Sequence, residues 1–589
     1  MTTRTIKRRP SSPLAGQWPG QMPALLQRIH AMRGALDGDQ AQPRLVHLLA
    51  PELLGGLDGA TALLEAAITQ GRHIVVVGDF DCDGATACAL GVRGLRMLGA
   101  TRVSYAVPNR VTHGYGLSPH LVADLVVLEP DVIVTVDHGI ACHAGIAAAK
   151  ALGWQVVVTD HHLPGPTLPL ADAIVNPNLV GDTFPSKMLA GVGVMFYVLL
   201  ALRRRLRDAG AFATGSEPDL SSLLDLVAVG TVADLVPLDV NNRALVAAGI
   251  RRLRAGQGCP GLCALAEVSG RDVRMLTASD IGFAIAPRIN AAGRLDDMAL
   301  GIACLLSDDP GHARELAGVL NQINGERRAV QAQMTDDADA ALARACLDDA
   351  VPAVVCLFDE QWNPGVVGLV ASKLKERLHR PAFAFAPAEP GSTQLRGSAR
   401  SIPGLHIRDV LAAVDSANPG LIERFGGHAM AAGLTLALEA FPRFERALGE
   451  AIGRMLDTAL LRDEVISDGE LHPPEFSRAI AELLRDGGTW GQAYPEPLFD
   501  GHFDVLAWRI VGERHLKLEL GMNGLRLNAV EFGGWRGLAP DARIHIAYRL
   551  VPDDYRGGDA IQLVIVHRQH GFASADAPAN QREAELPSC

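Results

Sequence analysis

The sequence predicts an α/β protein built from two α/β units that are joined by a long helix and followed by a small β-barrel. Its 589 residues far exceed the ~150 residues of a typical domain, so two to four packed units are expected. Short valine-rich runs alternate with alanine- and leucine-rich stretches over residues 73–236, as in α/β folds. After about residue 468, short strand-like runs are separated by turn residues, which is typical of small barrels.

The first unit is expected to contain a parallel, doubly wound sheet. Its strand-like runs are rich in valine and isoleucine and do not alternate cleanly with polar residues, as in strands covered on both faces. These runs occupy residues 73–78, 103–108, 131–136 and 154–159. The stretch 85–99 between two of them predicts a crossover helix.

The remaining elements follow in order along the chain. Residues 309–350 are almost free of proline and have helical spacing, which predicts a long connecting helix. Residues 351–467 predict a second α/β unit, and 468–570 a barrel of the oligonucleotide-binding type. The predicted barrel strands are 515–520, 525–532, 542–550 and 561–568. We assign 1–45 and 571–589 as terminal tails and expect residues 1–40 and 570–589 to be poorly ordered.

Composition excludes several classes of protein. With 66 acidic and 54 basic residues the net charge is −12, which argues against a histone-like binder but allows a local basic channel. The nine cysteines are too sparse for a disulfide scaffold, and Cys259 and Cys263, with three residues between them, have no second Cys/His pair at zinc spacing nearby, so we expect reduced thiols and a cytoplasmic location. The apolar stretch 188–202 is shorter than the ~20 residues of a membrane span, so we expect a buried helix and no membrane association. The basic N-terminus is not followed by an apolar run, and no secretory signal is expected.

Carboxylates and imidazoles recur at the ends of the predicted strands. Since the carboxyl ends of parallel strands lie at one edge of a sheet, these side chains are expected to gather there. Carboxylates crowded in this way repel one another unless divalent cations lie between them. The residues concerned are Asp79, Asp81, Asp83, Asp137, Asp160, His161 and His162, with Asp234 at the end of a later apolar segment.

The chemistry of this set favours Mn²⁺ or Mg²⁺. Oxygen ligands with one or two imidazoles suit these ions better than zinc or copper, and two such ions are the usual equipment for phosphoryl hydrolysis. A calcium loop of the EF-hand type also begins D-x-D-x-D-G, but its twelfth position requires Glu and here holds Leu90. A single such motif could also be a turn in which an aspartate caps the next helix. Recurrence at successive strand ends favours the metal site.

The motifs GDFDCDG, TVDHG, TDHH and GTVADLVPL, in this order, resemble the four motifs of the DHH phosphoesterase superfamily. Further segments are similar to those of one branch, the RecJ single-strand-specific exonucleases. These segments are 107–118, 288–295, 362–374, 396–401 and 425–434. The resemblance extends from about residue 45 to residue 570, and it implies a DHH catalytic domain at 46–308 and a DHH-associated substrate-binding domain at 351–467.

The resemblance implies roles for individual residues. Asp160 would orient the neighbouring imidazole, and His162 would face the scissile phosphate, where it stabilises charge or protonates the leaving oxygen. The ligands of two Mn²⁺ or Mg²⁺ ions would be Asp79, Asp81, Asp83, Asp137, His161 and Asp234. Substrate would be bound by Arg110, Arg288, Asn290, Ser398, Arg400, Gly426, Gly427 and His428, with Arg288, Ser398 and Arg400 on the 5′-terminal phosphate.

Several other positions bear on the substrate. We expect His113 and Tyr115 to touch the nucleotide. His138 stands where relatives commonly have Asn, and Asn363 where many have His. Neither change removes a carboxylate, so neither argues against catalysis. In the barrel, basic residues beside aromatic ones suit a groove that stacks bases; they are Lys517, Arg526, Arg549 and Arg556, with Tyr548 and Tyr555.

The function implied is a single-stranded-DNA-specific 5′→3′ exonuclease that releases 5′-mononucleotides by two-metal phosphodiester hydrolysis in DNA repair and recombination. The expected partners are single-stranded DNA, a single-strand-binding protein and a helicase, and the expected state is a monomer. One alternative keeps the chemistry but acts on short oligonucleotides, cyclic dinucleotides or a nucleotide phosphate. Another is a catalytically silent binding module, which would have lost metal carboxylates that are all present here.

Overall fold

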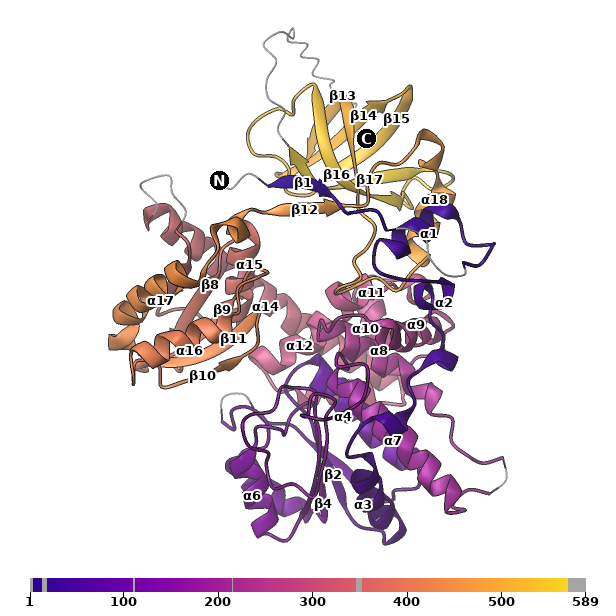
Figure 1. Cartoon of the computed structure of the whole chain (residues 1–589), viewed down its shortest axis with the longest axis vertical. Coiled ribbons are helices and arrows are strands. Elements are labelled where there is room, and N and C mark those ends of the chain that lie inside the picture. Colours follow the sequence, from indigo (N-terminus) through magenta and orange to yellow (C-terminus); the bar gives the residue numbers. More distant parts are fainter. Residues whose placement is uncertain (1–3, 13–17, 110–111, 214, 346–351, 570–589) are drawn as a thin grey trace.

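The computed structural model describes residues 4–12, 18–109, 112–213, 215–345 and 352–569. Figure 1 shows three bodies: the first α/β unit, the second α/β unit beside it, and the barrel at the C-terminal end of the described chain. Nothing in the described part of the chain forms a helix long and apolar enough to cross a membrane.

The first unit contains the predicted parallel sheet, which confirms the α/β fold. Its strands are β2 (Ile74–Val77), β3 (Val103–Ala106), β4 (Val132–Val136), β5 (Gln155–Thr159) and β6 (Ala173–Val175). All neighbours are parallel, in the order β3-β2-β4-β5-β6. The chain therefore runs from β2 to β3 on one side and then crosses to β4, β5 and β6 on the other side. The carboxyl ends of β2 and β4 flank the point where the winding reverses, which is where ligands bind in open α/β sheets.

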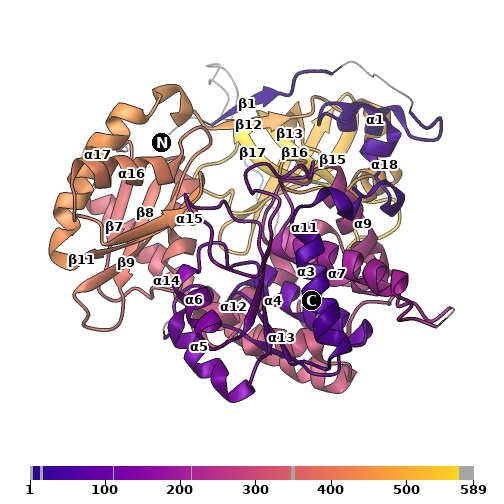
Figure 2. The same ribbon diagram turned by 60° about the horizontal axis from the view of Figure 1, so that its bottom comes forward.

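Helices cover both faces of this sheet, as valine-rich strands without alternation predict. Val76 and Val134 pack with α3 (Leu57–Thr69), α4 (Cys82–Met97) and α7 (Gly191–Asp208). Val75 and Ile133 point the other way and pack with α5 (Pro119–Leu125) and α6 (His143–Ala151). Figure 2 shows α5 and α6 on one side of the sheet and α3 and α7 on the other.

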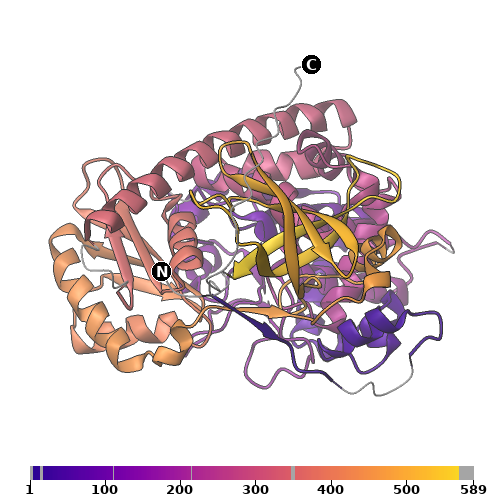
Figure 3. The same ribbon diagram turned by 90° about the horizontal axis from the view of Figure 1, so that it is seen from above.

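A helical region completes the first unit and leads to the second. Its elements are α8 (Leu224–Ala233), α9 (Val240–Arg254), α10 (Pro260–Val268), α11 (Ala278–Asp280), a π-helical turn (Ile281–Ile285), α12 (Ala286–Leu295) and α13 (Ala299–Leu306). The predicted connecting helix is α14 (Pro310–Ala345). Figure 3 shows it running from the first unit to the second.

The second unit is a mixed five-stranded sheet with helices on both faces. Its strands, in the order β10-β11-β9-β8-β7, are β7 (Val355–Phe358), β8 (Ala382–Pro387), β9 (Gln394–Arg400), β10 (Arg424–Gly427) and β11 (Ala431–Ala437). Phe383 and Phe385 pack against α16 (Ile407–Ala417) and α17 (Phe441–Met455). Ala382 and Ala384, on the other face, pack against α15 (Val367–Leu378).

The C-terminal strands close into the predicted barrel. They are β13 (Phe499–Val511), β14 (His515–Met522), β15 (Leu525–Glu531), β16 (Arg543–Pro552) and β17 (Ile561–Gln569), and α18 (Arg478–Asp486) packs beside β16. The closed order β13-β14-β15-β17-β16, with β15 and β17 parallel, is the Greek-key arrangement of the oligonucleotide-binding fold. One prediction here is wrong. Tyr548 cannot stack on bases because it lies in the barrel core with 1% of its surface exposed.

The predicted disorder of residues 1–40 is also wrong for the described residues of that segment. β1 (Thr5–Arg8) pairs in parallel with β12 (Glu464–Ser467), and α1 (Ala24–Ala31) and α2 (Gly38–Ala41) follow. Arg33 forms a buried ion pair with Asp468, with Nη2 2.7 Å from Oδ2. Partners from residues 464–468 order this segment, and the local sequence does not reveal such distant contacts. Residues 571–589 lie outside the described residues.

Candidate metal centre and substrate cavity

The loop after β2 places three aspartates at the reversal point of the sheet. Asp81 caps α4, where its Oδ1 accepts a hydrogen bond from the Gly84 amide at 3.0 Å. A Cβ on Gly84 would lie 2.5 Å from the backbone nitrogen of Asp79, so only glycine lets the helix begin this close to the strand end. Asn290 supports the same loop because its Oδ1 accepts from the Cys82 amide at 2.8 Å.

The N-terminus of α7 holds the third aspartate of the motif. Asp83 Oδ2 accepts from the Gly191 amide at 2.6 Å, and Oδ1 accepts from the Val192 amide at 3.0 Å. A Cβ on Gly191 would lie 2.4 Å from the Cβ of Asp137. The helix end therefore packs directly against the residue that follows β4.

Asp137 and His161 present unpartnered polar atoms to each other. Asp137 has a φ of 64°, an uncommon backbone conformation for a residue other than glycine. Its Oδ1 lies 3.1 Å from His161 Nε2, which is also 3.5 Å from Asp234 Oδ2. Asp137 Oδ1 and His161 Nε2 are both buried, and neither has a hydrogen-bond partner among the described residues. Buried polar atoms without partners are costly unless a ligand such as a metal ion satisfies them.

The six predicted ligands therefore converge. In each of three groups of residues, one ligand atom per residue lies within 4.8 Å of the others. Asp137 belongs to two of the groups and His161 to two, so the groups are contiguous. The groups are Asp79, Asp81 and Asp137; Asp83, His161 and Asp234; and Asp137, His161 and His162. Carboxylates with imidazole in this arrangement fit a pair of Mn²⁺ or Mg²⁺ ions.

The charges of the centre are poorly compensated by the protein itself. Burial, followed by the charge of Asp81, raises the pKa of Asp83 to about 7. Burial and the nearby Asp83 raise the pKa of Asp137 and of Asp234 well above the usual carboxyl range. Burial and the charge of His162 lower the pKa of His161 to about 3, so its imidazole is neutral and able to ligate. Divalent cations would relieve the repulsion among these carboxylates.

Asp160 and His162 form a separate pair beside the ligands. Asp160 Oδ1 accepts from His162 Nδ1 at 2.7 Å and from the His161 and His162 amides at 2.7 and 3.0 Å. Burial opposes both charges, but this hydrogen bond outweighs it: the pKa of Asp160 is lowered and that of His162 is raised to about 9. His162 is therefore protonated at neutral pH and oriented by Asp160.

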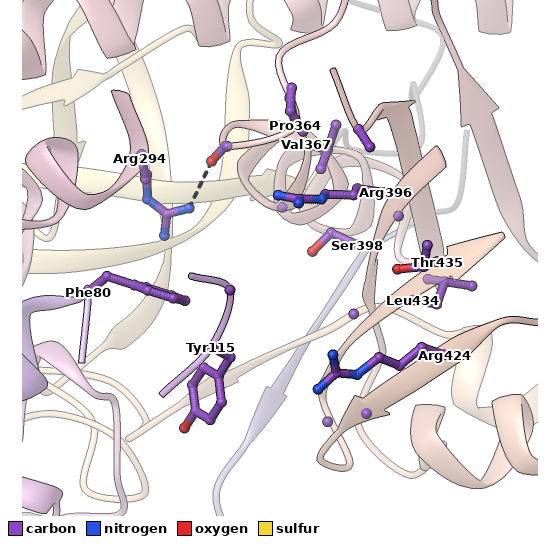
Figure 4. A pocket seen from close by; sticks show the side chains of 18 of the residues that line it. Phe80, Tyr115, Arg294, Pro364, Val367, Arg396, Ser398, Arg424, Leu434 and Thr435 are labelled. Atoms are coloured by element: carbon purple, nitrogen blue, oxygen red, sulfur yellow. Dashed lines mark hydrogen bonds between the residues drawn. The ribbon is translucent and has the colours of Figure 1, made fainter. Parts of the chain in front are cut away.

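A cavity of 1870 Å³ lies beside this centre, between the first unit and the second. Phe80, Tyr115, Asp160 and His162 line its wall on the first unit. Figure 4 shows Arg396, Ser398 and Arg424 on the opposite wall, extending toward Phe80 and Tyr115. The rings of His162 and His428 stack across the cavity with centroids 5.5 Å apart, so the two units meet beside the candidate metal ions.

The structure brings most of the predicted substrate residues to this cavity. Its lining includes Ser398, Arg400, Gly426, Gly427 and His428. Arg400 is positioned by Ser372, whose Oγ accepts from Nε at 3.1 Å. The first turn of α15 also reaches the cavity, through Val367 and Gly368, and helix N-termini favour anions.

Other predicted residues lie elsewhere. Arg288 is not among the described residues that line the cavity, because its guanidinium donates to Asn321 Oδ1 at 3.0 Å and to the Ala284 carbonyl at 2.5 Å. Asn290 supports the metal loop rather than the cavity wall. Arg110 lies outside the described residues. His113 does not line the cavity and instead lies 2.8 Å from Asp124 Oδ2 through Nε2.

The two departures from the family pattern have local roles. His138 is fully buried, with Nε2 3.1 Å from the Val77 carbonyl and Nδ1 3.9 Å from Cys142 Sγ, so both ring nitrogens have partners other than a metal. Asn363 lines the cavity, and its Oδ1 accepts from the Gly365 amide at 2.8 Å.

Sequence reasoning missed several arginines of the cavity wall. They are Arg294, Arg396, Arg408 and Arg424. Two of them carried a usable signal. Arg396 is two residues before Ser398 on β9, and Arg424 is two residues before Gly426 on β10, so the period of a strand places each on the same face as a predicted site residue.

Comparisons with known proteins agree with this architecture. Residues 73–231 match the DHH family N-terminal domain, 350–454 the DHHA1 domain and 467–567 the RecJ OB domain. The chain thus has the domains of a DHH phosphoesterase with an added barrel.

Relatives over nearly the whole chain define the family further. The single-stranded-DNA-specific exonuclease RecJ of Dickeya dadantii is 49% identical over 95% of this chain and 98% of its own length. The enzyme of the same name from Escherichia coli is 48% identical over 93% and 96%. A crystal structure of RecJ from Thermus thermophilus in complex with Mn²⁺ matches with a TM-score of 0.78 and 32% identity, covering 97% of this chain and 80% of that one. The chain belongs to the RecJ family.

Proposed function

We propose that this protein is a metal-dependent exonuclease specific for single-stranded DNA, which degrades the strand from its 5′ end and releases 5′-mononucleotides. The observation that carries the proposal is the convergence of six groups that could hold metal ions, beside a cavity whose far wall presents arginines. Family membership supports the same chemistry, since the relatives from D. dadantii and E. coli are named single-stranded-DNA-specific exonucleases.

The cofactor is a pair of Mn²⁺ or Mg²⁺ ions. RecJ of T. thermophilus has been crystallised with each of these ions. Asp79, Asp81, Asp83, Asp137, His161 and Asp234 would hold them. When bound, the ions would acidify water and neutralise charge on the phosphate under attack.

The protein's own side chains would position the substrate and supply a proton. Ser398 and Arg400 would bind the 5′-terminal phosphate, because the planar guanidinium matches phosphate oxygens. Asp160 keeps His162 charged and holds its Nδ1, so Nε2 is the ring nitrogen able to donate to the phosphate or to the leaving 3′-oxygen. Tyr115 and Phe80, whose rings meet edge to face at 5.9 Å, would contact the terminal nucleotide.

We also propose the biological setting that this activity implies: DNA repair and recombination in the cytoplasm, by a monomer that works with a single-strand-binding protein and a helicase. The proposed domains are 46–308, 351–467 and 468–570, with 309–350 as the connecting helix.

The test compares substrates in Mn²⁺. Purified protein is incubated with single-stranded DNA labelled at its 5′ or 3′ end, with blunt duplex and with a dinucleotide. We expect the 5′ label to appear at once as a mononucleotide, while the 3′ label stays in progressively shorter strands. Asp81→Ala and Asp137→Ala should abolish hydrolysis, whereas the exposed Asp58→Asn should not. Hydrolysis of the dinucleotide alone would favour a short-oligonucleotide phosphoesterase, and full activity of the alanine variants would refute the metal assignment.

A further inference from the structure

The sheet of the second unit turns three parallel rows of residues toward the cavity. In antiparallel strands, residues directly opposite one another lie on the same face. The first row joins Arg400 to Ala431, the second joins Ser398, Gly433 and Gly426, and the third joins Arg396, Thr435 and Arg424. Burial confirms the shared face, because Leu395, Ala399, Ala432 and Leu434, at the intervening positions, are buried in the core.

The three rows lie at increasing distance from the metal centre. His428, which follows β10 beside the first row, stacks on His162. Ser398 and Arg400 occupy the first two rows. Successive residues on one face of a strand are about 7 Å apart. The third row is therefore about 7 Å beyond Ser398, on the side away from the metal centre.

Two arginines and a hydroxyl occupy the third row, and the glycines of the second row leave a flat floor between them and the first. Arg396 and Arg424 line the cavity, and Figure 4 shows both extending into it. Among the described residues, neither arginine forms an ion pair or a side-chain hydrogen bond. The neighbouring Glu423 accepts instead from Gln394 at 2.6 Å. Arg396 on β9 and Arg424 on β10 flank Thr435 of the intervening strand β11, so an anion over Thr435 would have a guanidinium on each side.

We propose that Arg396, Thr435 and Arg424 form a distal phosphate subsite, which binds a phosphoryl group one row beyond the 5′-phosphate held by Ser398 and Arg400. The proposal rests on the proposed function, because it takes the first two rows as the site of the 5′-terminal phosphate. Guanidinium groups on two strands suit a phosphate, whose oxygens accept from both forks. The phosphoryl group bound at this subsite has one of two alternative sources. It is an outer phosphate of a 5′-triphosphorylated strand, or it is the 5′-phosphate of one additional nucleotide.

Binding in EDTA tests the subsite without hydrolysis. The probes are oligothymidylates with a 5′-hydroxyl, a 5′-monophosphate or a 5′-triphosphate, measured by fluorescence anisotropy. The variants are Arg396→Gln and Arg424→Gln, and the matched control is Arg446→Gln, an exposed arginine on α17 outside the cavity. Thermal unfolding checks that all variants fold.

If the outer phosphates are the source, wild type and Arg446→Gln bind the triphosphate about ten-fold more tightly than the monophosphate, as charged hydrogen bonds of this kind allow. In Arg396→Gln and Arg424→Gln that ratio falls toward one, while affinity for the monophosphate is kept. If an additional nucleotide is the source, the triphosphate gives no advantage over the monophosphate in wild type, and affinity for the monophosphate strand in EDTA falls about ten-fold in the two variants but not in Arg446→Gln.

The subsite is refuted if neither the triphosphate preference nor the affinity for the monophosphate strand depends on Arg396 and Arg424. Failure of the proposed function has a different signature. Wild type would then hydrolyse none of the strands in Mn²⁺, while the binding ratios in EDTA would still decide the subsite.

Discussion

Gly191→Ala perturbs the candidate metal centre without replacing any of its candidate ligands. The added Cβ would lie 2.4 Å from the Cβ of Asp137, 2.6 Å from its Oδ1 and 2.7 Å from its Cα. Carbon atoms rest about 3.5–4.0 Å apart, so Asp137 and α7 must separate by about 1 Å. Asp137 has little freedom, since it follows a buried strand and has a φ of 64°. The amide of Gly191 also donates to Asp83, so the substitution should shift the group that contains Asp83 as well as the two groups that contain Asp137.

The size of the effect can be worked out for the free energy of unfolding and for the reaction rate. Overpacking costs about 1–3 kcal/mol, partly offset by the ~1 kcal/mol by which alanine favours a helix over glycine. A displacement of about 1 Å in a catalytic constellation reduces the rate about 100-fold. The Mn²⁺ affinity should fall together with the rate, because both depend on the position of Asp137.

The assay compares Gly191→Ala with Gly193→Ala by thermal unfolding, Mn²⁺ calorimetry and initial rates on single-stranded DNA. Gly193 lies in the same helix, but its added Cβ would meet only the flexible side chain of Leu189, at 3.2 Å. The control should keep near-normal rate and affinity. If the two variants have the same rate and Mn²⁺ affinity, the placement of Asp137 against α7 does not control the centre.

Three further changes test separate parts of the structure. Asp137→Asn should weaken binding of both Mn²⁺ ions and lower the hydrolysis rate more than about 100-fold, since this carboxylate is shared; calorimetry and rate assays measure both. His30 is fully buried, and burial lowers its pKa to about 4, below the ordinary 6.5. Protonation therefore favours unfolding, and the stability present above pH 6.5 should fall by about 3 kcal/mol as pH drops to 4; His30→Gln should flatten this part of the unfolding profile. Arg33→Met should destabilise the protein by about 1–3 kcal/mol in urea unfolding, because the buried Asp468 loses two charged hydrogen bonds and keeps the ion pair with Arg9 at 3.2 Å.

Each of these has an outcome that contradicts it. Loss of a single Mn²⁺ ion in Asp137→Asn would show that the carboxylate is not shared. A pH profile unchanged by His30→Gln would assign the acid sensitivity to other groups. Arg33→Met is compared with Arg44→Met, whose side chain is 68% exposed; equal unfolding free energies would show that the N-terminal segment does not contribute to stability.

The convergence of the candidate metal ligands was predictable because several of them follow easily recognised strands. Asp79 and Asp137 directly follow valine-rich runs, and parallel strands bring their carboxyl ends to one edge. Asp234 was grouped with them because it ends a later apolar segment, which the structure shows to be the helix α8 rather than a strand. His161 Nε2 faces Asp137 because of how the side chains pack, which the spacing of residues in the sequence does not determine.

The errors have physical causes that differ from one another. β1 has no local signal, because its pairing partner begins at Glu464, far along the chain. Tyr548 did carry a signal: Ile544, Ile546 and Leu550 share its parity on β16, and an apolar row of this kind faces a barrel interior. The roles of Arg288 and Asn290 stay predictions; the two residues are two positions apart on α12, where such residues do not face each other.

The most direct test of the central claim is an anomalous diffraction map from crystals soaked in Mn²⁺. Two peaks about 3.5–4 Å apart are expected, one beside Asp79 and Asp81, the other beside Asp83, His161 and Asp234, with Asp137 touching both. No peak at this edge of the sheet, or a single peak that Asp137 does not contact, would contradict the two-ion centre.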